Sequence, residues 1–459
     1  MSKNPSTKLN PLPRGIVLLV DCILAVVGYY IAYLIRFPLP LPAENLMALQ
    51  NMTPWIALGT MAVFGSMGLY GLPHLDGNQT TASVVVAVAL LELATMAGAF
   101  WFRSFAFPRT VFGIAVLIHL ALLVPWRGLV RAIDKKAGAG LRLLVVSDSD
   151  NSQVDRLAGN LGGQTSVVAR VSSSGALDML AGGLPEFDAV LLNATDSPLN
   201  RRLLQQFAVA GKPVLVSPSP ADIMMASAQA GQVDDQPILL ISGLGLSPGQ
   251  VFMKRAIDVV LAVVGLALGL PLLVLAALAI AVSSGTPVLY GQERTGARGS
   301  TFRVWKLRTM RKDAELDSGP VLATKNDPRV TPVGRVLRAT RIDEIPQLFN
   351  VLRGDMSVVG PRPERPEFVK VYASTIPHYG YRHLVKPGLT GLAQVRGRYS
   401  TKAEDKLLYD LTYVANYSLL LDLTIVLQTL ATLITPSSSA GVSAAAARSA
   451  QAKTGRPLQ

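Results

Sequence analysis

The stretch FMKRAIDVVLAVVGLALGLPLLVLAALAIAV, residues 252–282, is apolar and longer than the roughly 20 residues that cross the hydrocarbon of a bilayer. Pro271 lies near its middle, and a proline there bends or breaks a helix because it lacks an N–H and its ring clashes with the preceding turn. Basic residues lie at its start or follow it: Lys254, Arg255, Arg294, Arg298, Arg303, Lys306 and Arg308. Basic flanks stay in the cytoplasm, which a straight span cannot satisfy at both ends. Two interpretations remain open: a re-entrant helix that enters and leaves one membrane face, with its break at Pro271, or an ordinary kinked span.

The whole chain of 459 residues is 50% hydrophobic and 16% charged, against about 25% charged residues in an average soluble protein. This composition excludes a disordered chain, and the single cysteine, Cys22, allows no disulfide within one chain. The formal net charge of +13 favours anionic membrane lipid or phosphorylated substrates as partners. No zinc-finger spacing, heptad run or aromatic-basic RNA motif occurs in the sequence, so we expect no nucleic acid partner.

Four apolar segments precede the long stretch, at about 16–35, 54–70, 83–102 and 111–124. Each approaches the length of a membrane-spanning helix, and together they predict a four-helix transmembrane domain over residues 1–137. The basic residues at its two ends place both ends in the cytoplasm: Lys3, Lys8, Arg14, Arg127, Arg131, Lys135 and Lys136. Asp21 and Glu92 lie in or near the spans, where a charge is costly. We interpret them as contacts between helices, with a proton relay as the alternative.

Residues 138–245 have a different character. The pieces LRLLVVS, SVVARV, DAVLLN, PVLVS and PILLIS are typical of short buried strands, and helical stretches such as 200–210 separate them. This alternation predicts a doubly wound parallel sheet with covering helices. The first strand is followed by SDSDNSQ, which has no glycine-rich turn to admit a pyrophosphate. The sequence therefore favours a structural or regulatory module over a dinucleotide-binding domain.

The stretch RATRIDEIPQLFNVLRGD, residues 338–355, contains the densest set of chemical groups. Pro346 suits the first turn of a helix and Gly354 suits its end. The spacing of Leu348, Phe349 and Leu352 predicts that these three side chains share its apolar face.

Asp343 and Glu344 lie at or just before the start of this helix. The helix dipole and free N–H groups there favour anions and lower the pKa of a carboxyl group. An ionised carboxylate could attack phosphorus while its neighbour holds Mg²⁺. Plain capping of the helix is the alternative.

Basic residues surround the Asp-Glu pair and favour a phosphate substrate. They are Arg338, Arg341, Arg362 in the rigid turn GPRP, and Lys306 and Arg308 in TFRVWKLRTM. Planar guanidinium groups match phosphate oxygens, and prolines reduce the cost of ordering them. A carboxylate pair among these cations predicts a diphosphate site.

From Lys254 to about Thr429 the sequence resembles the bacterial sugar transferase family, the monotopic polyprenyl-phosphate sugar-1-phosphate transferases. The blocks that carry this resemblance are FMKRAIDVV, GTPVLYGQERTGARGSTFRVWKLRTM, RATRIDEIPQLFNVLRGDMSVVGPRPERPEF, KPGLTGLAQVRGR and KLLYDLTYVANYSLLLDL. The family implies transfer of a sugar-1-phosphate from a nucleotide diphosphate sugar, commonly a UDP-sugar, to undecaprenyl phosphate, with release of UMP.

The resemblance also implies roles for individual residues. Asp343 would be the nucleophile that forms an aspartyl-phosphosugar intermediate, Glu344 would bind Mg²⁺, and Arg338 and Arg362 would hold phosphate oxygens. The family favours the re-entrant form of 252–282, although many members have a serine where this chain has Leu270. It places the protein in the bacterial inner membrane with its catalytic domain facing the cytoplasm, where it primes exopolysaccharide, capsule or O-antigen synthesis.

The expected fold class is therefore a membrane protein of α plus α/β type. After the two N-terminal domains, a re-entrant-helix catalytic domain of mixed α/β type covers 246–435, and a disordered tail covers 436–459. Closed symmetry makes a homodimer the expected oligomer. A non-catalytic membrane scaffold or regulator of a polysaccharide assembly complex is the rival function. The many-helix polytopic transferases need more spans than this sequence has.

Overall fold

The computed structural model describes residues 12–70, 81–101, 108–138, 141–148, 165–182, 186–192, 197–226, 228–240, 244–312, 314, 327–397 and 401–434. The chain divides into two compact units, Met1–Ser219 and Pro220–Gln459. The predicted tail 436–459, the N-terminal Lys3 and Lys8, and most of SDSDNSQ lie outside the described residues.

The first unit begins with four helices, α1 (Arg14–Arg36), α2 (Ala43–Ser66), α3 (Thr81–Trp101) and α4 (Arg109–Gly138). Helix α1 packs on α2 and α4, and α3 packs on α2 and α4. Within the described part of the chain, four helices are long and apolar enough to cross a membrane: α1, α3, α4 and the later α9. The sequence predicted a span over 54–70, but α2 is not among the four. It begins at Ala43, and its first turns contain polar residues such as Glu44 and Gln50.

Asp21 and Glu92, the two carboxylates predicted in the four-helix domain, each form contacts between its helices. Asp21 of α1 accepts hydrogen bonds from the Tyr70 hydroxyl at 2.9 Å and from Nε of Arg127 at 3.2 Å. Glu92 of α3 accepts one from the Tyr29 hydroxyl at 2.6 Å and lies 2.5 Å from Nδ1 of His119. Each buried charge therefore has partners on other elements, as the interpretation as interhelix contacts requires.

The described strands of the first unit form a parallel sheet in the order β2-β1-β3-β4. Their bounds are β1 Leu141–Val146, β2 Thr165–Val171, β3 Ala189–Leu192 and β4 Val214–Val216. Helices α6 (Ser173–Gly182) and α7 (Pro198–Val209) cover one face, where Ala176, Leu203 and Phe207 pack against the strands. The parallel sheet is therefore confirmed. The described helices that pack on the strands, α6 and α7, share this one face, so the doubly wound arrangement stays a prediction.

The fifth predicted strand, PILLIS, belongs elsewhere. Its first four residues lie in β6 (Gln236–Leu240), which pairs antiparallel with β5 (Gln229–Val233) in a separate hairpin of the second unit. All five side chains of β6 are exposed, among them Leu239 at 62%. The prediction of a buried strand in the parallel sheet is wrong here, because a short apolar run does not reveal which strand it pairs with.

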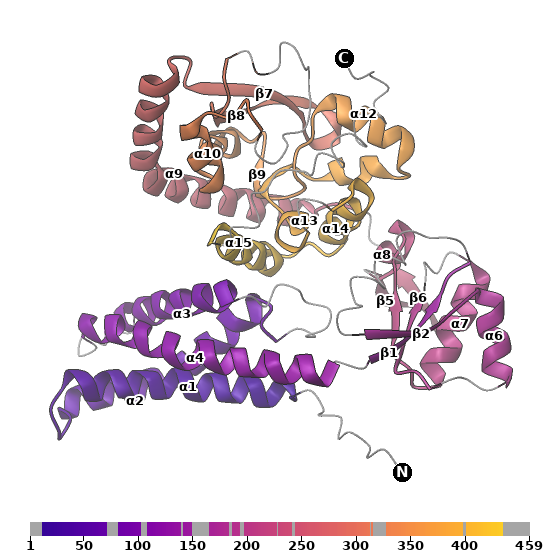
Figure 1. Cartoon of the computed structure of the whole chain (residues 1–459), viewed down its shortest axis with the longest axis horizontal. Helices are drawn as coiled ribbons and strands as arrows, with labels where there is room; N and C mark the ends of the chain where they lie inside the picture. Colours follow the sequence, from indigo (N-terminus) through magenta and orange to yellow (C-terminus); the bar gives the residue numbers. More distant parts are fainter. Residues whose placement is uncertain are drawn as a thin grey trace. The chain divides into compact units, whose positions relative to one another are not determined.

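The second unit is a mixed α/β structure built around helix α9 and a β-hairpin (Figure 1). Its further helices and strands are α8 (Pro220–Ala226), β7 (Leu289–Thr295), β8 (Thr301–Leu307), α10 (Pro332–Ala339), α11 (Gln347–Arg353), β9 (Ser357–Val359), α12 (Pro366–Thr375), β10 (Gly388–Thr390), α13 (Leu392–Arg396), α14 (Ala403–Ala415) and α15 (Leu419–Ile434). The largest core cluster of this unit draws on α9, α11, β9 and α14, with Ala262, Val351, Val359 and Val414 among its members.

Helix α9 runs from Pro248 to Ser284 with Pro271 inside it, and Figure 1 shows that its axis bends between its two halves. A capping box between Ser247 and Gln250 fixes its start. Only 17% of its most apolar 18-residue stretch is buried. Soluble monomers rarely expose an apolar surface of this kind. The bend fits either of the two arrangements that the sequence allows for this helix.

Three charged residues in the first turns of α9 attach it to the rest of the second unit. The Lys254 ammonium pairs with Asp422 of α15 at 2.6 Å. Arg255 donates to the carbonyl oxygens of Val351 and Leu352, at the end of α11. Asp258 accepts from Ser357 Oγ and from the backbone N–H of Val358, each at 2.9 Å.

Candidate active site

The Asp-Glu pair lies in a tight turn between α10 and α11. Arg341 adopts the left-handed conformation, with φ 58°, and Ile342–Glu344 form a single 3₁₀ turn, η2. Pro346 then caps α11, and Gly354, with φ 97°, ends it while its N–H donates to the carbonyl of Asn350 at 3.0 Å. The predicted helix and its glycine end are confirmed.

The buried face of α11 differs from the predicted one. Leu348 and Val351 are buried, whereas Phe349 is 51% exposed, so its place on the apolar face was wrongly predicted. Helix α11 packs against α9. A Cβ on Gly265 would lie 3.0 Å from Cδ1 of Leu348, so the absence of a side chain at this glycine allows the close approach.

Glu344 is the most strongly paired carboxylate of the site. Among the described basic side chains, three meet it: Lys306 Nζ at 3.3 Å, Arg362 Nη2 at 3.1 Å and Arg341 Nη1 at 3.6 Å. Burial alone would raise the pKa of Glu344, but these cations outweigh it and hold that pKa well below its usual range. Glu344 therefore stays ionised, and three basic side chains lie around its carboxylate.

Asp343 is 7% exposed and has the opposite character. Burial, together with the charge of Glu344, raises the pKa of Asp343 to about 6, although Lys306, Arg338 and Arg341 oppose the rise. The sequence predicted a lowered pKa from the helix dipole. That prediction is wrong for Asp343, because desolvation and a like charge exceed the effect of one short helix. Its Oδ1 atom is buried and has no hydrogen-bond partner among the described residues.

The two remaining predicted basic residues, Arg338 and Arg308, make different contacts. Arg338 lies near Asp343, lowers its pKa, and donates from Nε to Thr309 Oγ1 at 2.8 Å. Arg308 is directed elsewhere: its Nη2 donates to the carbonyls of Ser284 at 2.8 Å and Gly285 at 2.5 Å. Its described contacts therefore hold the C-terminal end of α9, where unpaired carbonyl groups need donors.

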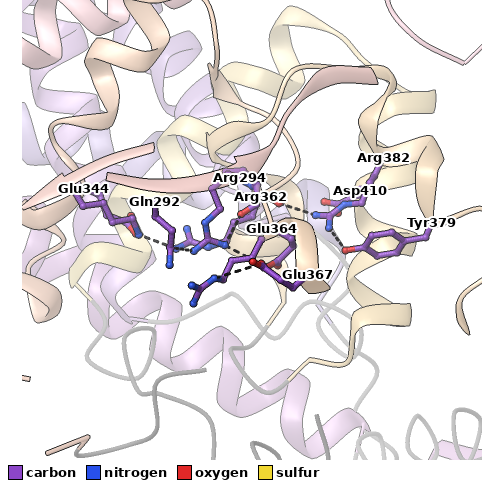
Figure 2. Close-up of polar contacts among 12 residues, drawn as sticks. Gln292, Arg294, Glu344, Arg362, Glu364, Glu367, Tyr379, Arg382 and Asp410 are labelled. Carbon is purple, nitrogen blue, oxygen red and sulfur yellow. Dashed lines mark hydrogen bonds and ion pairs between the residues drawn. The ribbon is translucent and has the colours of Figure 1, made fainter. Parts of the chain in front are cut away.

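Figure 2 shows a second cluster of charges beside the site, and sequence reasoning did not single it out. Arg382, in the 3₁₀ segment η3 (Tyr379–Leu384), pairs with Asp410 of α14 at 2.7 Å and donates to the carbonyl oxygen of Arg362 at 3.0 Å. Arg294 of β7 donates to the carbonyl oxygen of Pro363 at 3.1 Å. The buried Arg382 and the partly buried Arg294 thus both contact the backbone of the GPRP turn. An acidic residue on the inner face of an amphipathic helix was the available signal for Asp410.

The Asp-Glu turn could hold a magnesium ion together with phosphate oxygens of a substrate. Among the residues that the structure describes, no group of three or more His, Cys, Asp or Glu side chains could hold a metal. Mg²⁺ is usually held by one or two carboxylates, phosphate oxygens and water. Oδ1 of Asp343 lacks a partner within the described chain, and the cation facing Oε2 of Glu344 lies 3.6 Å away. Oε2 of Glu344 could therefore serve as the metal ligand, while Oδ1 of Asp343 stays available to a substrate.

The sequence is similar to proteins of one enzyme family. Residues 249–436 match the family model described as bacterial sugar transferase. The UDP-glucose:undecaprenyl-phosphate glucose-1-phosphate transferase of Caulobacter vibrioides is 49% identical over 189 residues, which cover 40% of this chain and 70% of that protein. The exopolysaccharide production protein PSS of Rhizobium leguminosarum is 40% identical over 191 residues, which cover 40% of this chain and 96% of that protein.

A third relative matches over a longer stretch, which still covers less than two thirds of that relative's own length. The UDP-N-acetylgalactosamine-undecaprenyl-phosphate N-acetylgalactosaminephosphotransferase of Aeromonas hydrophila is 38% identical over 259 residues, 55% of this chain and 60% of that protein. The segment that matches the family model, residues 249–436, contains the Asp-Glu turn and the GPRP turn. This chain therefore belongs to the bacterial sugar transferase family.

Proposed function

We propose that the protein transfers a sugar-1-phosphate from a UDP-sugar to undecaprenyl phosphate, releases UMP and so primes the synthesis of an exopolysaccharide, capsule or O-antigen. The names of two relatives, one using glucose and one using N-acetylgalactosamine, support this donor class and this acceptor. The observation that carries the proposal is the pairing of Asp343, whose Oδ1 is buried without a partner in the described chain, with a Glu344 that gathers three cations.

The chemistry follows from these two environments. An oxygen of the ionised Asp343 attacks the phosphorus next to the sugar, and the bond to the UMP oxygen breaks as UMP takes the electron pair. An oxygen of undecaprenyl phosphate then attacks the same phosphorus and expels Asp343 as a free carboxylate. This two-step exchange lets a water-soluble donor and a lipid acceptor use one site in turn.

The basic residues would neutralise the negative charge that both steps bring together. Arg362 is 36% exposed, so its guanidinium can turn from Glu344 toward a phosphate oxygen. Lys306 pairs with Glu344 and Arg338 lies near Asp343, and both would stabilise the growing charge on the phosphoryl oxygens. Mg²⁺, held by Glu344, would supply further charge neutralisation at the donor diphosphate.

Helix α9 would hold this site at the membrane surface. We propose that it is re-entrant, with its bend at Pro271 and both ends in the cytoplasm. The proposal is supported by its basic flanks and its exposed apolar residues, such as Leu268 and Leu275. In this arrangement the protein lies in the bacterial inner membrane and meets the lipid phosphate at the headgroup plane. The predicted homodimer and the regulatory role of the sheet domain stay predictions.

A direct assay tests this function. Full-length protein in detergent with Mg²⁺, undecaprenyl phosphate and a panel of UDP-sugars should release UMP, and EDTA should abolish the release. Asp343→Asn should lose it by several orders of magnitude, whereas Asp355→Asn, a matched change outside the site, should retain it. Mass spectrometry of protein quenched with donor alone should find a phosphosugar on Asp343. Product formation without that adduct, or undiminished turnover of Asp343→Asn, would contradict the mechanism, and a wild type that consumes no donor would favour the scaffold.

A further inference from the structure

The turn that carries Arg362 cannot fix its own shape. Pro361 and Pro363, on either side of Arg362, have no N–H and so cannot donate hydrogen bonds to carbonyl groups within the turn. These carbonyl groups therefore depend on donors from other segments. At its start, Gly360 N–H donates to the Thr390 carbonyl and the Pro361 carbonyl accepts from Gly388, both at 2.9 Å. These backbone bonds leave the carbonyls of residues 362–364 to be satisfied from elsewhere.

Two arginines and one backbone amide satisfy those carbonyls. Arg382 Nη2 donates to the oxygen of residue 362 at 3.0 Å and Arg294 Nη1 to that of residue 363 at 3.1 Å. The N–H of Thr295 donates to the oxygen of Glu364 at 2.9 Å. The backbone of Arg362 is thus held from one side while its guanidinium reaches Glu344 on the other, as Figure 2 shows.

Arg382 is itself held in place by buried groups. It is 5% exposed, its Nη1 donates to the Tyr379 hydroxyl at 2.5 Å, and its Nη2 lies 2.7 Å from Oδ2 of Asp410, which is 2% exposed. A buried charge without a partner is strongly destabilising, so each member of this pair requires the other. The structure records no contact between Asp410 and either Asp343 or Glu344 within the described residues.

We propose that Arg382, oriented by Asp410, is a positioning residue that sets where the Arg362 guanidinium lies when it takes the diphosphate of the donor. The proposal rests on the proposed function, because it assigns Arg382 a part in recognising that substrate. Arg382 acts through the backbone of residue 362 and does not itself touch the reacting atoms. Since a misplacement of about 1 Å in a site of this kind can cost about 100-fold in rate, the pair should matter well beyond its contribution to folding.

The decisive variant replaces the whole pair with apolar side chains, Arg382→Met with Asp410→Leu. Such a replacement often leaves stability unchanged, because it removes two buried charges together, but it deletes the donor to the Arg362 carbonyl. We expect a melting temperature near that of the wild type, with kcat/KM for the UDP-sugar reduced about tenfold or more. Lys254→Met with Asp422→Leu is the matched control, since it replaces another buried pair whose described contacts do not include the carbonyls of residues 362–364.

A double-mutant cycle with Arg362→Ala separates positioning from structure. If Arg382 acts through Arg362, the apolar pair should lower kcat/KM little further once Arg362 is alanine, whereas a purely structural effect would add to it. Calorimetric binding of UDP with Mg²⁺ gives the same comparison without turnover. Weaker UDP binding in the apolar pair variant is expected even if the wild type transfers no sugar, so the two proposals fail separately. Wild-type UDP affinity and kcat/KM in a well-folded apolar pair variant, or additive losses in the cycle, would overturn the positioning role.

Discussion

Gly269 of helix α9 lies so close to Ile345 that a Cβ atom on the glycine would stand 3.2 Å from Cγ2 of the isoleucine. Ile345 directly follows Glu344, so this contact sets the Asp-Glu turn against the middle of the apolar helix. A Cβ atom at position 269 would require Ile345 to give way by a few tenths of an ångström, and a larger side chain would require more.

Gly269→Val should therefore displace the turn. We expect a loss of about 1–3 kcal/mol in stability from overpacking and a fall of about tenfold or more in kcat/KM as Asp343 shifts. The measurements are thermal melting in detergent and UMP release. Ala267→Val, which adds the same side chain at an exposed position of the same helix, is the control. Equal turnover of the two variants would contradict a role for this contact.

The raised pKa of Asp343 makes a prediction about stability. Its folded pKa is about 6 against about 3.9 in an unfolded chain, so the fold favours the protonated form and is destabilised as pH rises through 6. The cost above pH 7 is about 3 kcal/mol. Asp343→Asn removes the charge, and we expect it to raise the melting temperature clearly at pH 8 and about half as much at pH 5. The same shift at both pH values, or a lower melting temperature at pH 8, would show that the carboxylate is not destabilised by its surroundings.

Arg308 offers a test of two roles for one residue. Its guanidinium donates to the last carbonyls of α9, so Arg308→Ala should lower stability by about 1–3 kcal/mol through unsatisfied buried groups. The KM for the UDP-sugar should stay unchanged, whereas Lys306→Ala should raise it. An increased KM with an unaltered melting temperature would instead assign Arg308 to substrate binding, as the sequence predicted.

The path of α9 through the membrane can be read with a single-cysteine method, because Cys22 is the chain's one cysteine. In a Cys22→Ala background, Gly249→Cys and Ser283→Cys place a thiol near each end of α9, at exposed positions. A re-entrant helix predicts that a membrane-impermeant maleimide labels both from the cytoplasmic side of oriented vesicles. Labelling from opposite sides would establish the kinked span.

Local signals in the sequence predicted the elements best. Gly354 ends α11 with a positive φ because glycine alone adopts it at little cost, and Pro346 begins that helix because it needs no N–H there. The four strands of the parallel sheet and helix α7 also lie where apolar runs and their separation place them. Each of these features depends on neighbours within a few residues.

The missed features depend on contacts between distant segments. Arg382 and Asp410 meet only when η3 and α14 pack together, and neither residue stands in a recognisable motif. The pKa of Asp343 depends on burial that no local pattern reveals, and the same is true of the exposure of β6. The path of α9 depends on the lipid bilayer around it, and the only signal for this path in the sequence is the charge of the residues that flank the helix.

The ionic attachments at the start of α9 restrict how this protein could be divided. Lys254, Arg255 and Asp258 pair with polar groups on α15, α11 and β9. Deleting the apolar helix would therefore leave these polar groups without their partners inside the remaining fold. We expect that a variant without this segment, made to obtain a freely diffusing enzyme, would form inclusion bodies. The membrane helix and the catalytic residues would therefore have to be kept in the same folding unit.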